Sequence, residues 1–96
     1  MKLLFIICES SVDAKITDML RSIGAPGYTR FTDCTGFGAS GLREGSPVWP
    51  GLNSLLLAAM PEELVPQVFD QIDALKAHRA GKLAVKIFVL PMEEWQ

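Results

Sequence analysis

A chain of 96 residues has the length of one folded domain. With 49% hydrophobic residues and a formal net charge of −2, it has neither the composition of a disordered protein nor the basic surface of a nucleic-acid-binding one. Two cysteines do not make a disulfide framework, and the first apolar run is too short for a signal peptide or a membrane span. We therefore expect a single cytoplasmic domain, residues 1–96, with reduced thiols and no nucleic acid as a partner.

The first half of the chain predicts a strand, a helix and a second strand. Leu3–Cys8 is a continuous apolar run, as is typical of a buried strand. Ser10 and Ser11 are helix-start residues, and the helical spacing of apolar residues that follows ends at Gly24. Residues 28–35 alternate in the manner of a strand.

The second half predicts a strand, a helix and a last strand. Leu52–Met60 is very apolar, and a short turn after it leads into a helix that begins near Pro66. Gly81 is the expected cap of that helix, and Leu83–Leu90 is the expected last strand. The buried stripe of the helix is predicted to be Val68, Phe69, Ile72 and Leu75.

The order strand, helix, strand, strand, helix, strand predicts an α+β fold of the ferredoxin-like, split βαβ type. In this βαββαβ fold a four-stranded antiparallel sheet carries both helices on one face. The other face is then left uncovered, and the sequence supplies no third helix to cover it. Because an exposed apolar sheet face favours association, we expect an oligomer.

A glycine-rich segment, residues 36–51, is expected to be an irregular loop. Glycines at 36, 38 and 41 could offer bare backbone N–H groups to an anion, although glycines after a strand also serve simply as turns. Long loops in small domains are usually functional, and we expect residues 39–50 to be mobile without ligand. Trp49 suits a partner contact there, with a packing anchor as the alternative.

Several motifs resemble those of the PII signal-transduction family. They are Gly27-Tyr28-Thr29, Gly36-Phe37-Gly38-x-x-Gly41 and Lys86-Ile87-Phe88-Val89. The order and spacing match over most of the chain, with one extra residue between Gly27 and Gly36 that we interpret as a bulge in the second strand. The resemblance implies a PII-like signalling and regulatory protein.

The resemblance also implies an assembly, a ligand and a partner. We expect a homotrimer that binds a small-molecule effector, ADP, ATP or AMP, in the clefts between subunits. A flexible loop would then regulate a protein partner, either a membrane transporter or an enzyme. The expected ligand-binding residues are Gly36, Phe37, Gly38, Ala39, Ser40 and Lys86. The expected partner-binding loop contains Gly41, Arg43, Glu44 and Trp49.

The chain departs from the family pattern in three places. Leu83-Ala84-Val85 stands where typical members have Gly-Asp-Gly before the last strand. The arginines that follow that strand in typical members are missing, and the loop lacks their modified tyrosine. We therefore expect a divergent member with weak triphosphate binding, for which fewer phosphates, another small anion or a metal are alternatives.

A metal-responsive trimer linked to metal tolerance or export is the alternative function. Its candidate ligands are Cys8, Cys34, Met60 and His78, of which Cys34 is the best placed, but no pair has a typical ligand spacing. A structural role for these residues is the simpler interpretation. Because no catalytic set emerges around the single histidine, we do not expect an enzyme.

Overall fold

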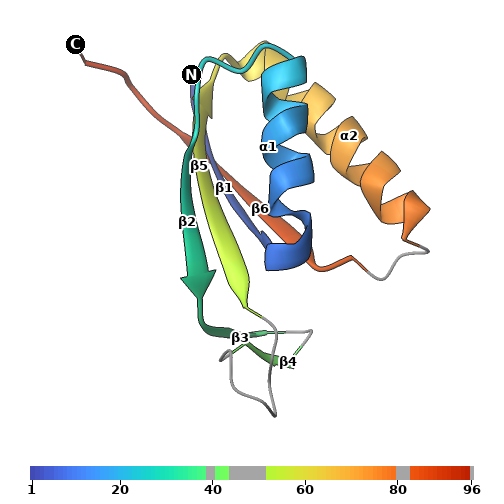
Figure 1. Cartoon of the computed structure of the whole chain (residues 1–96). Helices are drawn as coiled ribbons and strands as arrows, with labels where there is room; N and C mark the ends of the chain where they lie inside the picture. The colour runs from blue at the N-terminus through green and yellow to red at the C-terminus, as the bar shows by residue number, and fades with distance from the viewer. Residues whose placement is uncertain (39–40, 44–51, 80–82, 96) are drawn as a thin grey trace.

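One antiparallel sheet of four strands, in the order β2-β5-β1-β6, carries two helices on one face (Figure 1). The computed structural model describes residues 1–38, 41–43, 52–79 and 83–95. The helices are α1 (Asp13–Ser22) and α2 (Val65–His78). The strands are β1 (Lys2–Glu9), β2 (Thr29–Cys34), β5 (Asn53–Met60) and β6 (Val85–Pro91). The predicted ferredoxin-like α+β fold is confirmed, with strand ends displaced by one or two residues.

The second strand contains the extra residue that the sequence predicts. Phe31 pairs with Leu55 and Cys34 pairs with Asn53. Between these two pairs the chain advances by three residues in β2 but by only two in β5. Asp33 occupies the bulge with φ of 57°, in the left-handed region that Asp tolerates better than most residues. The predicted bulge is therefore confirmed, and it turns the chain toward the glycine-rich segment.

Helix α1 begins later than its serines predict. A 3₁₀ turn, η1 (Ser10–Val12), precedes it, and no side chain caps either element. The Ser10 hydroxyl instead donates to the carbonyl of Leu52, at 2.8 Å, and so joins the ends of β1 and β5. At the other end Gly24 has φ of 82°, which confirms it as the residue that ends the helix.

Helix α2 follows the short turn η2 (Glu62–Leu64), as predicted, and Pro66 is its second residue. Val68 and Ile72 are buried against the sheet. The prediction for Phe69 is wrong, because 41% of this residue is exposed. Phe69 lies one position around the helix from Val68 and therefore falls at the border of the buried stripe. The predicted cap, Gly81, lies outside the described residues.

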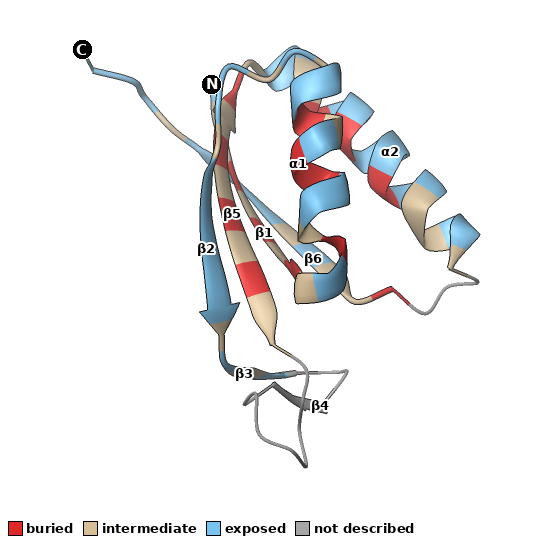
Figure 2. Ribbon diagram, viewed as in Figure 1, coloured by how far each residue is buried: buried red, intermediate tan, exposed pale blue. Residues whose placement is uncertain are grey.

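The core lies between the sheet and the helices, where Figure 2 shows the buried residues. Leu4, Ile6 and Cys8 of β1 alternate with half-buried residues, as a strand with one covered face requires. A polar group is included in this layer: the Ser54 hydroxyl donates to Asp13 Oδ2 at 2.6 Å, and Arg30 lies 3.8 Å from Asp13 Oδ1. Ser54 is fully buried, so this hydrogen bond offsets the cost of burying its hydroxyl.

Candidate functional site

The sheet face opposite the helices is apolar, and no helix of the described residues lies on it (Figure 1). We call it the open face. The strand register places these apolar residues on it: Leu3, Phe5, Ile7, Phe31, Leu55, Leu57, Ala59, Phe88 and Leu90. Phe31 and Phe88 are each 47% exposed. A contiguous apolar face of this kind marks an interaction site.

The open face becomes polar at the end where the glycine-rich segment begins. Glu9, Asn53 and Cys34 are paired across β1, β5 and β2 and form the last row of the face. Lys86 lies one row further in, on β6, where it pairs with Ile7. Its ammonium group lies 5.9 Å from the centre of the Phe88 ring, two residues along the same face. A positive charge, an amide and a carboxylate thus gather at one end of an apolar surface.

The glycine-rich segment is more regular than the sequence predicts. Its beginning forms strand β3 (Gly36–Gly38), which pairs with strand β4 (Gly41–Arg43) in a small second sheet. The expectation of an irregular loop from residue 36 is therefore wrong for these six residues. Three of the six residues are glycines, which by composition favour turns, yet the backbone of each takes part in the β3–β4 pairing.

Gly36 meets the polar end of the open face directly. A Cβ atom built on Gly36 would lie 3.3 Å from the side-chain nitrogen of Asn53. A side chain at this position would therefore be in tight contact with Asn53, and the amide would have to shift by a few tenths of an ångström to admit it. The next residue, Phe37, is 82% exposed and has its ring free for contact with a ligand or another chain.

The structure brings some of the predicted ligand-binding residues to the same end of the sheet and separates others. Gly36 follows β2 at one edge, whereas Lys86 lies on β6 at the opposite edge. Three strand spacings correspond to about 14 Å. In Figure 1 the β3 segment leaves the edge at β2 and crosses below the end of β5. A ligand that meets both residues must therefore be extended.

The remaining predicted residues are less completely placed. Gly41 and Arg43 lie in β4, where the structure describes their backbone only. Ala39, Ser40, Glu44 and Trp49 lie outside the described residues, as does most of the expected mobile loop. The roles of these residues in binding ligand or partner stay predictions.

The metal candidates do not come together. Cys8 and Met60 are buried in the core at opposite ends of the sheet, Cys34 lies on the open face, and His78 ends α2 on the helical side. Burial raises the pKa of the Cys8 thiol to about 12, with smaller contributions from Asp13 and Glu9, so this thiol is a poor ligand at neutral pH. Within the described part of the chain, no three His, Cys, Asp or Glu residues are grouped closely enough to hold a metal.

The sequence analysis missed two residues of the site, Glu9 and Asn53. Both stand at strand ends, where polar residues ordinarily need no functional explanation. Their places follow only from the register, which pairs them directly and sets Asn53 against Gly36. The alternation of β1 and β5 could have shown that Glu9 and Asn53 continue the open face, once the pairing was known.

Comparison with protein-family models assigns the chain. It matches the model described as "Nitrogen regulatory protein P-II" over residues 1–96. The chain therefore belongs to the P-II family, a family of regulatory proteins, and its resemblance to PII proteins is confirmed. No curated protein matches it. Across the described residues, no helix combines the length and apolarity needed to cross a membrane.

Solved structures support the same assignment. CPII from Thiomonas intermedia K12, bound to ADP and bicarbonate, is 29% identical, with a TM-score of 0.71 over 93% of this chain and 84% of that one. CPII has also been solved with ADP, AMP and bicarbonate together. A Thermus thermophilus protein described as PII-like and signalling is 28% identical, with a TM-score of 0.65 over 93% of this chain and 83% of that one.

A third structure shows that the fold extends to more distant sequences. A DUF3240 family protein from Shewanella baltica OS155 has a TM-score of 0.71 at 14% identity, over 99% of this chain and 92% of that one. This likeness concerns the fold alone. The chain is thus a PII-like signalling protein by family and fold, with relatives that bind adenine nucleotides.

Proposed function

We propose that this protein senses an adenine nucleotide between the copies of a homotrimer and regulates a transporter or an enzyme through the loop that starts at Gly36. The family match over residues 1–96 carries this proposal. The binding of ADP and AMP by CPII favours a mono- or diphosphate. The open face, with its apolar centre and polar end, is the surface on which copies would meet.

The composition of the site supports a ligand with few phosphates. Lys86 is the one cation that the strand register places on the open face among the described residues, and Glu9 stands near it in the next row. A single lysine acts on a phosphate as a point charge, so it meets the charge of a monophosphate or diphosphate better than that of a triphosphate. Leu83 is buried where typical family members have a glycine, which agrees with a reduced phosphate cradle.

The polar end of the open face suits an extended ligand shared between subunits. Backbone N–H groups at Gly36 and the exposed ring of Phe37 would meet one end of the nucleotide. Lys86, on the opposite edge strand β6, would meet the other end. Bicarbonate, which CPII binds with ADP, is a reasonable second effector to test.

Calorimetric titration of the purified protein tests the proposal. AMP, ADP and ATP are titrated separately, with and without bicarbonate. We expect dissociation constants on the order of 10 μM, or about −7 kcal/mol. Lys86→Ala should weaken ATP binding more than AMP binding, because each added phosphate adds charge. Lys76→Ala, which removes a lysine from α2, is the matched control and should leave binding unchanged. If none of the three nucleotides produces a heat of binding, the proposal is rejected.

A further inference from the structure

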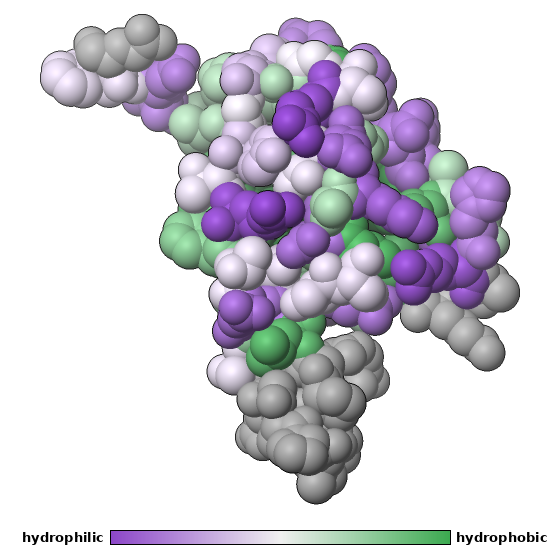
Figure 3. Space-filling view, in the orientation of Figure 1, coloured by the Kyte–Doolittle hydropathy of each residue, from purple (hydrophilic) through white to green (hydrophobic). Residues whose placement is uncertain are grey.

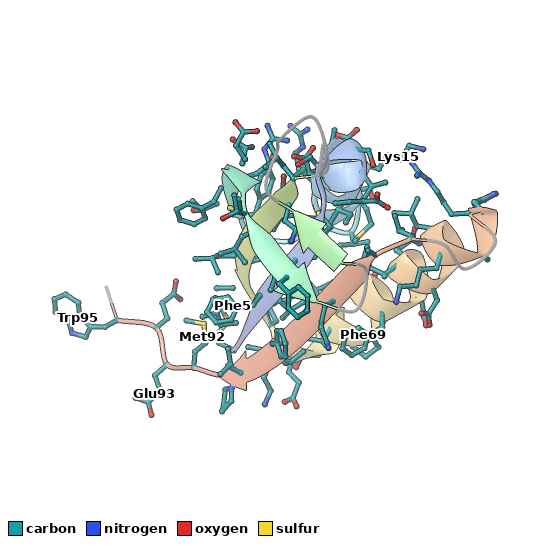
Figure 4. The ribbon with its side chains drawn as sticks, turned by 90° about the horizontal axis from the view of Figure 1, so that it is seen from below. Phe5, Lys15, Phe69, Met92, Glu93 and Trp95 are labelled. Carbon is teal, nitrogen blue, oxygen red and sulfur yellow. The ribbon has the colours of Figure 1, made fainter. Side chains whose placement is uncertain are left out.

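The segment after β6 leaves the body of the protein. Its first residue, Met92, donates its backbone N–H to the carbonyl of Met1 at 3.4 Å. Beyond it the chain extends away from the sheet, as Figures 1 and 4 show. Trp95, near the end of this segment, is 94% exposed. We call residues 92–95 the tail.

The tail has the composition of a docking segment. Trp95 follows two carboxylates, Glu93 and Glu94, so a large apolar group is flanked by negative charge. Tryptophan buries 150–250 Å² when it docks and is the residue most often found at the energetic centre of an interface. A surface that fits the tail must therefore combine an apolar hollow with a positive rim.

A groove between α1 and α2 has these properties. It has a volume of about 230 Å³, and its floor consists of Ile16, Met19, Ile72 and Leu75. Lys15 and His78 stand at its rim, and the described residues that line it include no acid. The nearby Asp18 is already paired with Arg21 at 2.8 Å, so it leaves the charge of Lys15 free. Figure 3 shows green apolar surface between the polar side chains over the helices.

We propose that the tail of one copy docks in the groove between α1 and α2 of a second copy, with Trp95 against Met19 and Leu75 and with Glu93 or Glu94 paired with Lys15. Sulfur–aromatic contact and the proximity of the ammonium group to the indole both favour this arrangement. The contact lies on the helical side of the sheet and is thus separate from the open face and from nucleotide binding.

A second copy is a better donor than the same chain. The tail starts where β6 pairs with Lys2, whereas Lys15 of the groove lies in the first turn of α1, which begins four residues after β1 ends at Glu9. The eight residues of β1 span about 26 Å, and four tail residues reach at most about 14 Å. Figure 4 shows Trp95 and Lys15 on opposite sides of the molecule.

A second groove, between α2 and β6, fits the tail less well. Its volume is about 340 Å³, and it is lined by Phe69, Ile72, Asp73, Lys76, Val85 and Ile87. Asp73 stands beside Lys76 there and opposes the approach of two carboxylates. Charge complementarity therefore favours the groove at Lys15.

The fluorescence of Trp95 reports docking directly. In a Trp49→Phe background, Trp95 is the only tryptophan of the chain. We expect its emission to shift to shorter wavelength as protein concentration rises, and Lys15→Glu to weaken this transition about tenfold. Lys15→Arg, which keeps the charge, is the matched control and should leave the transition in place.

A charge swap makes the test specific. Adding Glu93→Lys and Glu94→Lys to the Lys15→Glu protein should restore the transition, while circular dichroism confirms that each variant is folded. Solvent-like emission at every concentration would overturn the proposal. So would a shift that persists in a folded, monomeric Leu90→Glu protein, which would indicate docking within one chain, or a shift that Lys15→Glu leaves unchanged, which would indicate another surface.

Discussion

The side-chain amide of Asn53 lies against the backbone of Gly36, so close that a Cβ atom on Gly36 would be 3.3 Å from the amide nitrogen. This contact joins the root of the glycine-rich segment to the last row of the open face. The position therefore tolerates a side chain only if Asn53 moves.

A double-mutant cycle tests this contact. Gly36→Ala should destabilise the protein by about 1 kcal/mol, because the added methyl group displaces the amide. In an Asn53→Ala background the same substitution should cost almost nothing, because the space is then free. Urea unfolding of the four proteins gives the coupling free energy. Equal costs in both backgrounds would show that the contact does not limit residue 36.

Two other glycines distinguish the effect of backbone conformation from the effect of the space available for a side chain. Gly24 has φ of 82° and no atom within 4 Å of a Cβ position, whereas Gly27 has the same free space and no such φ. Gly24→Ala should therefore destabilise the protein by about 1–2 kcal/mol, and Gly27→Ala should be neutral or slightly stabilising. Thermal unfolding distinguishes them. If both lose stability equally, the left-handed conformation is not the cause.

The burial of Cys8 predicts an alkaline loss of stability. Its pKa is raised from 9.0 to about 12 in the folded protein, mainly by burial. Between these values the unfolded chain loses a thiol proton that the folded chain keeps, so the free energy of unfolding falls as pH rises. The slope is about 1.4 kcal/mol per pH unit. Below the unfolded pKa both states are protonated and the effect vanishes.

Comparison with Cys8→Ala isolates this contribution from other groups that titrate in the same range. The variant loses stability through its cavity, but that loss is the same at every pH. From about pH 8 to about pH 10 the wild type should lose more stability than the variant. Parallel pH profiles of the two proteins would show that the Cys8 thiol is not responsible.

The sequence predicts the fold well because apolar periodicity marks each element. Both helices and all four long strands follow from runs such as Leu3–Cys8 and Leu52–Met60. The bulge near Asp33 follows instead from the resemblance to the PII family, whose spacing between Gly27 and Gly36 is one residue shorter. Errors occur where local signals conflict with tertiary contacts. Ser10 is a good cap by type, but its hydroxyl serves the Leu52 carbonyl instead. Phe69 is apolar yet lies at the border of its helix stripe.

The site is less predictable because the strand register determines which residues lie together in it. Glycine spacing and Lys86 could be found in the sequence, but their separation across the sheet could not. Asn53 and Glu9 join the site only because β1 and β5 pair at those residues. The hairpin of β3 and β4 contains the glycines at 36, 38 and 41, which indicate turns in a sequence although the backbone pairs them here.

The open face predicts assembly, and adjacent residues of β6 offer a matched test. Leu90 and Val89 are 40% and 38% exposed but point to opposite faces. Leu90→Glu should dissociate the proposed trimer, because a buried leucine contributes about 1.5–3 kcal/mol and a carboxylate there must be desolvated. Val89→Glu should leave the trimer intact in sedimentation experiments. A wild-type protein that sediments as a monomer at micromolar concentration would contradict the assembly.

The binding of ADP to the Leu90→Glu protein tests the central claim most directly. Leu90 lies four residues from Lys86, at the end of the open face remote from Gly36, so its substitution separates assembly from the ligand contacts. A site shared between copies requires that the wild type binds ADP on the order of 10 μM and that a folded, monomeric Leu90→Glu protein does not bind it. Equal affinity of the monomer and the wild type would contradict a site between subunits, and no binding to either would contradict nucleotide sensing altogether.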